Sequence, residues 1–508
     1  MKQMITWLIL VALIKNLIWS LFIPLWQFPD EQAHFGHVAY LAEGGQLPMG
    51  KGNNLTEEIA ISEQLLGTYR NKYGNNQFTY HPEYRLEYTG NFAGKYEKEI
   101  KNLPLSSRKN FTDAESAYYP HFFYRVSGFI YRLFYGQDIF IRVFTIRFFW
   151  LGAHLILIWL AFKIGQLVFP KDNTAAVSVA VLTGFHPMLT FVSAGFTSDN
   201  LHNVLFTAVI YLCLRLWQKL DRQNLLVLAA VMGFGFINKP QFLIALGIVV
   251  PVLLWQIAKQ KQWQLAGLFG GAFFIVALIF GRENLGGIWN SVKVGELPFF
   301  NVSTQLVRPD YSLWQHTIYT TQHTFREDLP WYWGVFRWLS LTLPRWVNRV
   351  MMRILLVAVI GLVIKFWRRK FEPGFWIIVW SALIYFLALF FWDWQHIKNA
   401  GFPFGIQGRY YFPVIVPHLV LLIIGIKQVW SKLLIILNYW FIILNLVAFY
   451  WVTASYYDAS SFKTFIIQAS QYKPAFAKGW WLITVLVLYF VLTLIFSVQL
   501  FKTFRHEK

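Results

Sequence analysis

The chain has 508 residues, of which 56% are hydrophobic and only 14% are charged. A soluble domain of this length needs a charged surface, so the composition excludes one and identifies a polytopic membrane protein. The formal net charge is +20, but the basic excess lies on one side of the apolar segments. It therefore indicates membrane topology, and we expect no nucleic-acid partner.

Apolar segments long enough to cross about 30 Å of hydrocarbon as helices recur along the whole chain. They lie near residues 5–25, 139–162, 174–195, 200–217, 223–238, 241–258, 264–281, 347–366, 374–392, 410–426, 431–452 and 479–500. We expect an all-α bundle of about twelve transmembrane helices, with residues 1–508 forming a single transmembrane domain. The first segment has no small-residue cleavage site behind it, which favours an uncleaved anchor over a signal peptide.

Lys15 and Asn16 interrupt the first apolar segment. Ionisable residues inside a span are costly and usually face the interior of the bundle. We expect a polar contact between helices here, and a role in transport stays the alternative.

Basic residues are concentrated in the connections that share a side with the N-terminus, for example Arg368, Arg369 and Lys370. The long connection 26–138 carries similar numbers of acidic and basic residues. The positive-inside rule then predicts an integral protein of the inner or plasma membrane with both termini cytoplasmic. The loops 26–138, 282–346, 393–409 and 453–478 face the exterior.

The first external loop, residues 26–138, is too long to be plain coil and should carry structure of its own. It opens with Asp30 and Glu31, where the chain leaves the membrane. A carboxylate at this boundary either marks the interface or has a functional reason to be there, because it costs about 2.5–3.5 kcal/mol in hydrocarbon. His34 and His37 follow at helical spacing, and residues 116–135, which include Tyr124, resemble an amphipathic interfacial helix.

Three further polar residues lie near the expected outer face, namely Asp199, Lys239 and Arg409. Each also has a structural alternative: Asp199 as a helix N-cap, Lys239 as a snorkelling turn residue, and Arg409 as a structural ion-pair partner. Together with the first carboxylates they come from separate regions at one membrane depth, as a cavity for an ionic headgroup requires.

Tryptophans near the span ends suit an interfacial aromatic belt. Trp333 belongs to a cluster in the second large external loop, residues 282–346, where an aromatic face could instead stack on a sugar ring or a prenyl chain.

Several short motifs follow one another along the chain. They are Pro29-Asp30-Glu31 with His34, Tyr119-Pro120 to Tyr124, Thr197-Ser198-Asp199-Asn200-Leu201, Gly235 to Pro240, Trp333-Gly334-Val335-Phe336 and Gln407-Gly408-Arg409-Tyr410-Tyr411-Phe412-Pro413. In this order they resemble the GT-C membrane glycosyltransferases, above all the family 39 type, which includes protein O-mannosyltransferases and aminoarabinose transferases, and a related group of uncharacterised bacterial membrane proteins. There is no Trp-Trp-Asp-Tyr-Gly motif, which argues against an oligosaccharyltransferase.

The resemblance implies transfer of a sugar from a polyprenyl-phosphate-type lipid donor to a glycan, lipid or protein acceptor on the external face, with inversion. Asp30 would be the general base, and Arg409 and Lys239 would lie near the donor phosphate. Further catalytic candidates are Glu31 and Asp199. Possible substrate contacts are His34, His37, Tyr124, Trp333 and Tyr410.

A divalent metal stays possible, because Asp30, Glu31, Asp199, His34 and His37 could supply ligands. The alternative is that the histidines form hydrogen bonds within the first loop. Two other functions also stay open: a transporter or flippase for a lipid-linked sugar, and a non-catalytic protein of cell-envelope assembly.

Overall fold

The computed structural model describes residues 2–46, 52–72, 74–88, 90–113, 115–117, 119–293 and 306–506. Residues 294–305 of the predicted second external loop, 282–346, therefore lie outside the described residues. Helices dominate the described chain, and its one sheet is a small antiparallel hairpin. The hairpin pairs β1 (Val335–Phe336) with β2 (Leu341–Thr342).

Nine helical spans of the described chain are long and apolar enough to cross a membrane. They comprise α1 (Lys2–Phe22), α6 (Ile139–Val168), η2 (Pro240–Ala245) with α11 (Leu246–Gln260), α12 (Gln264–Lys293), α15 (Arg345–Arg368), α16 (Phe375–Ala400), η4 (Gly408–Val414) with α17 (Ile415–Val429), α18 (Leu433–Tyr456) and α20 (Trp480–His506). The protein is thus an all-α polytopic membrane protein.

The three other predicted spans are helical as well. A tenth candidate is α7 (Asn173–Phe185) with α8 (Pro187–Ala194), if this pair, bent by 56°, is one span. The bend falls at Pro187, whose ring cannot continue a helix from the preceding turn. The predicted positions near 200–217 and 223–238 are occupied by α9 (Asp199–Gln218) and α10 (Arg222–Asn238). Of these, α10 has only 17 residues, and α9 carries Asp199 and Arg215 at its ends.

The shorter helices lie in the connections. The first connection contains α2 (Glu31–Ala42), α3 (Glu57–Leu66), α4 (Gly90–Lys101), η1 (Leu105–Arg108) and α5 (Phe122–Leu133). Between α12 and α15 come α13 (Leu313–His323), the π-helical turn η3 (Thr324–Asp328) and α14 (Leu329–Trp333). Between α18 and α20 come α19 (Phe462–Ala469) and η5 (Ala475–Ala477). The helices expected after Glu31 and within residues 116–135 are α2 and α5.

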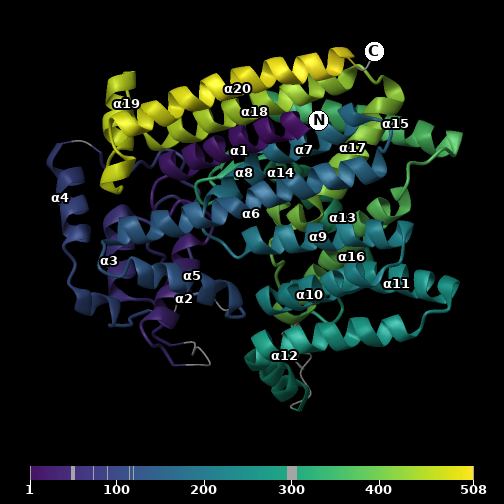
Figure 1. Cartoon of the computed structure of the whole chain (residues 1–508). Helices are drawn as coiled ribbons and strands as arrows, with labels where there is room; N and C mark the ends of the chain where they lie inside the picture. Colours follow the sequence, from purple (N-terminus) through teal and green to yellow (C-terminus); the bar gives the residue numbers. More distant parts are fainter. Residues whose placement is uncertain are drawn as a thin grey trace.

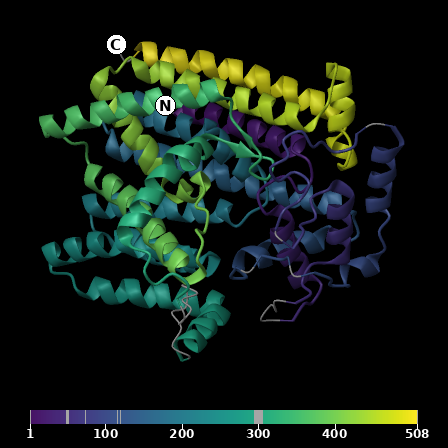
Figure 2. The same cartoon turned by 180° about the vertical axis from the view of Figure 1, so that it is seen from behind.

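The long helices lie side by side, and the short helices of the first connection gather at one end of them (Figure 1). The two termini lie at the opposite end, and the view from behind shows the same arrangement (Figure 2). Both termini therefore lie at the same end of the bundle.

Close packing of the helices depends on small residues at some contacts. Where α15 meets α17, Gly361 faces Gly425, and a Cβ on Gly361 would lie 1.8 Å from the carbonyl oxygen of Gly425. Only glycine permits this approach of the two backbones.

Lys15 forms the polar contact between helices that we predicted. Its side chain is fully buried in α1, and Nζ donates to the Thr190 hydroxyl at 2.7 Å and to the carbonyl of Gly184. These acceptors flank the bend between α7 and α8, where carbonyls lack a helical partner. Asn445 of α18 also donates to Thr190, at 3.0 Å, so three segments of the bundle meet at this point.

Candidate functional site

Asp30 occupies the last position before α2, with a left-handed backbone (φ 53°). This conformation is uncommon for a residue other than glycine and is tolerated best by Asn and Asp. The carboxylate accepts a hydrogen bond from Arg70 at 2.8 Å on one oxygen and from Arg409 at 3.1 Å on the other. The Asp30 side chain keeps 41% of its surface exposed, whereas that of Arg409 keeps 8%.

The two arginines determine the charge state of Asp30. Burial by itself would raise the pKa of Asp30, but the guanidinium groups of Arg409 and Arg70 outweigh it and hold the pKa well below its usual range. Asp30 is therefore ionised at neutral pH, and it is a weak base while both arginines are in place.

Arg70 is a member of the site that the sequence does not reveal. It lies beyond α3 in a polar stretch with no helical periodicity and no motif, so no signal distinguishes it from other loop arginines. Besides Asp30 it pairs with Glu115 at 3.0 Å, and its guanidinium lies 4.6 Å from the ring centroid of Trp338. The Trp338 indole donates to the carbonyl of Trp26 at 3.1 Å, which ties the hairpin β1–β2 to the start of the first connection.

Asp199 and Lys239 form a second ion pair beside the first. Lys239, directly before η2, donates to the carboxylate of Asp199 at the start of α9. Asp199 is the first residue of α9, and Ser198 stands at the N-cap, so the N-cap alternative for Asp199 is not what the structure shows. The Lys239 ammonium also lies 4.6 Å from the ring centroid of Tyr119.

The two ion pairs belong to one cluster. Arg409 is near enough to act electrostatically on both Asp30 and Asp199. α9 packs against η4, which carries Arg409. The structure thus brings together four of the predicted residues, Asp30, Asp199, Lys239 and Arg409, and adds Arg70.

Glu31 differs from Asp30 in its burial and in its ion-pair partner. It is fully buried and paired with Arg147 of α6, whose Nε donates to it at 2.7 Å. The same guanidinium donates to the carbonyls of Ser20, Ile23 and Pro24 at the end of α1. Glu31 therefore joins α1, α2 and α6, and its oxygens are bonded within the fold, while the catalytic role stays a prediction.

His34, His37 and Tyr124 also lie inside the protein. His34 contacts the Tyr124 hydroxyl at 2.8 Å and the Thr197 hydroxyl at 3.1 Å, which uses both ring nitrogens. His37 contacts His121 at 2.9 Å and stacks on Tyr124. Burial lowers the pKa of His34 to about 4 and that of His37 to about 2, so both rings are neutral. These residues support α2 against α5, as the alternative reading of the histidines expects.

Of the two predicted aromatic contacts, one lies at the cluster. Tyr410 is partly buried, and its ring centroid is 5.4 Å from the guanidinium carbon of Arg409. Trp333 is 3% exposed and stacks on His186 with ring centroids 5.1 Å apart. Trp338, in the same segment between α12 and α15, borders the ion cluster.

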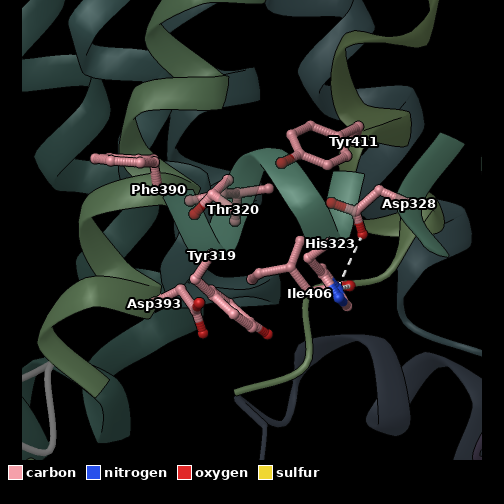
Figure 3. A pocket seen from close by; sticks show the side chains of 9 residues that line it. Tyr319, Thr320, His323, Asp328, Phe390, Asp393, Ile406 and Tyr411 are labelled. Atoms are coloured by element: carbon pink, nitrogen blue, oxygen red, sulfur yellow. Dashed lines mark hydrogen bonds and ion pairs between the residues drawn. The ribbon is translucent and has the colours of Figure 1, made fainter. Parts of the chain in front are cut away.

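The segment before Arg409 is held by a protonated histidine. His323 of α13 contacts the carbonyl of Ile406 at 2.8 Å and pairs with Asp328 at 3.3 Å, as Figure 3 shows. The bond with Asp328 outweighs burial and raises the pKa of His323 to about 9. The cavity beside it, about 10 Å³, has room for about one water molecule. Two residues after Ile406, Gly408 packs so closely on α14 that a Cβ would lie 2.3 Å from the nitrogen of Tyr332.

The sequence matches the family described as "Predicted membrane protein (DUF2142)" over residues 13–417. The chain belongs to this family. No curated protein matches it in sequence.

Among solved structures, the DUF2142 chain is similar to two GT-C proteins. ArnT from Cupriavidus metallidurans in the apo state is 14% identical with a TM-score of 0.40, over 97% of this chain and 76% of ArnT. ArnT bound to undecaprenyl phosphate gives the same identity and TM-score over 91% of this chain and 76% of that one. An oligosaccharyltransferase from Archaeoglobus fulgidus, tethered to an acceptor peptide, is 11% identical with a TM-score of 0.40, over 93% and 55%.

The arrangement of donor atoms does not suit a metal ion. Asp30 and Asp199 are bonded to cationic side chains, Glu31 to Arg147, and both nitrogens of His34 to hydroxyl groups. Within the part of the chain that the structure describes, no three His, Cys, Asp or Glu side chains form a group that could hold a metal ion. None of the chemical steps assigned to these residues therefore involves a metal ion.

Proposed function

We propose that this DUF2142 protein is a membrane glycosyltransferase that moves a sugar from a polyprenyl-phosphate-type lipid to a glycan, lipid or protein acceptor. One observation carries the proposal: residues from five separate parts of the chain place Asp30, Asp199, Arg70, Lys239 and Arg409 in one cluster. The carboxylate of Asp30 stays 41% exposed, so an acceptor can reach it.

The cations suit the leaving group of this reaction. Breaking the bond between the anomeric carbon and the phosphate oxygen leaves a polyprenyl phosphate, on which negative charge accumulates in the transition state. A guanidinium that is already in place stabilises that charge without reorganisation. We assign this role to Arg409, with Lys239 as the second cation.

The same cations explain how Asp30 becomes a base. While Arg409 and Arg70 both bind Asp30, its pKa is too low for efficient proton transfer. A donor phosphate competes for Arg409 and so weakens one of the two contacts that stabilise the carboxylate. The pKa of Asp30 then rises, and the carboxylate accepts the proton of the acceptor hydroxyl or amine as the acceptor attacks. Attack from the face opposite the phosphate inverts the anomeric carbon.

We place this chemistry on the external face. The proposal treats residues 1–508 as one transmembrane domain, with 26–138 and 282–346 as external loops and both termini cytoplasmic. It is supported by the basic connections on the side of the termini and by the position of the termini opposite the helices of the first connection (Figure 1).

The proposal is tested by donor consumption in reconstituted vesicles. Purified protein is supplied with short-chain polyprenyl-phosphate sugars and an extract of cell-envelope glycans, lipids and proteins, and the lipids are followed by mass spectrometry. We expect free polyprenyl phosphate to accumulate as the sugar leaves the donor. A transporter would move the labelled lipid across the bilayer chemically unchanged, and an assembly protein would leave it both unmoved and unchanged; either result would reject the proposal.

A further inference from the structure

A second cavity lies between α14 and α15, and none of the five charged residues of the ion cluster lines it. Tyr332 of α14 packs on Gly408 beside Arg409, whereas the next residue, Trp333, lines a cavity of about 420 Å³. The apolar wall of the cavity includes Phe325, Leu329 and Met352. Phe325 and Met352 are exposed, so the cavity opens on the surface of the bundle. A volume of this size is typical of a small-ligand pocket.

Two arginines complete the wall of this cavity. Arg349 and Arg353 are one turn apart on α15, so their side chains share one face of the helix. Both are exposed, and neither forms an ion pair with any residue that the structure describes. Arg353 lies about 12 Å along the helix axis from Arg345, where α15 begins.

Unpaired arginines at this depth need an anion. α15 is a candidate membrane span, and a cation that faces hydrocarbon costs about 2.5–3.5 kcal/mol even on the lenient insertion scales. This end of α15 is also the one we place outside, where the positive-inside rule does not favour arginine. The positive-inside rule therefore does not account for these two arginines.

Trp333 forms a buried part of the cavity wall: it is 3% exposed and stacks on His186. The cavity therefore combines an apolar and aromatic wall with two cations.

We propose that this cavity binds an anionic phospholipid of the surrounding bilayer. One acyl chain lies along the apolar wall, and the phosphate accepts hydrogen bonds from Arg349 and Arg353. Guanidinium groups match the phosphate in both charge and geometry. A bilayer lipid is the occupant we choose, rather than the sugar donor, because the cavity opens on the surface of the bundle and no charged residue of the ion cluster lines it.

The test compares lipids that differ in charge and share their acyl chains. Delipidated full-length protein is incubated with phosphatidylglycerol or phosphatidylcholine, and retained lipid is counted by native mass spectrometry. We expect the wild type to retain phosphatidylglycerol preferentially. The double variant Arg349→Gln/Arg353→Gln should retain it about tenfold less, since two charge-assisted contacts are lost. Arg345→Gln removes one arginine charge from the start of α15, outside the cavity. This variant should retain phosphatidylglycerol like the wild type.

A second pair of variants tests whether the acyl chain of the lipid lies in the cavity. Met352→Trp fills the apolar part of the cavity and should also weaken retention of the phospholipid. Leu356→Trp, one turn further along α15, should not. Thermal unfolding of each variant separates lost binding from lost fold. The proposal is overturned if both lipids are retained equally, if Arg345→Gln and the double variant behave alike, or if a polyprenyl phosphate displaces the phospholipid at equal concentration.

Discussion

Asp30 and Glu31 are adjacent in the sequence, yet the fold gives them opposite environments. Asp30 is partly exposed between two arginines of the cluster, and Glu31 is enclosed against Arg147. The sequence could locate both at the membrane exit, because that depends only on the end of the apolar segment. It could not separate their roles, because Arg147 is 116 positions from Glu31 in the chain, and burial depends on tertiary packing.

The buried pair of Glu31 and Arg147 should be essential for stability. Glu31→Gln keeps the shape but leaves the charge of Arg147 buried without a counter-ion, so we expect a loss of about 3–5 kcal/mol. The free energy of unfolding can be measured in detergent with denaturant. The double variant Glu31→Gln/Arg147→Met removes both charges and should recover part of the loss. A Glu31→Gln protein as stable as the wild type would contradict this account of the pair.

Arg70 should control the pH dependence of the reaction. The lowered pKa of Asp30 places the acid limb of the wild-type rate profile below the usual range of an aspartate. Arg70→Gln removes one stabilising cation, so the pKa of Asp30 rises and the acid limb moves to higher pH. The measurement is the rate of donor consumption against pH. Arg326→Gln is a control on an exposed arginine. An equally large shift of the acid limb in that variant would show that the limb does not report the pKa of Asp30.

At the scale of elements, the apolar segments predicted the long helices well because hydrophobic length is a local property of the sequence. The elements that complete the site were harder to predict. The turn containing Arg70 and the hairpin bearing Trp338 are short and irregular, and only long-range contacts define them. Four charged residues of the cluster could therefore be predicted from topology and motif order, while Arg70 could not.

The segment that carries Arg409 should respond to pH through His323. The pKa of His323 is raised from 6.5 to about 9, so its contribution to stability is complete below pH 6.5 and is lost as the pH rises through about 9. We expect the protein to lose about 2–3 kcal/mol across this window. The free energy of unfolding of His323→Gln should change much less over the same range. Parallel curves for the two proteins would contradict the role of His323.

At the scale of the whole molecule, the proposed function requires the ion cluster to lie on the external side of the membrane. The only cysteine, Cys213, is buried, so Cys213→Ser gives a background for single-cysteine labelling. In intact cells, an impermeant thiol reagent should label Asp458→Cys, which lies in the loop 453–478. It should label Lys219→Cys only after lysis. The reverse pattern would place the cluster on the cytoplasmic side.

The most direct test of the central claim is donor turnover by an Asp30 variant in the reconstituted system. Asp30→Asn keeps the size of the side chain and removes the base, so we predict that the release of polyprenyl phosphate slows by about 10²–10⁴-fold while donor binding is retained. Asp458→Asn, an exposed carboxylate expected on the same face, should turn over donor like the wild type. Release at the wild-type rate by Asp30→Asn would contradict the account.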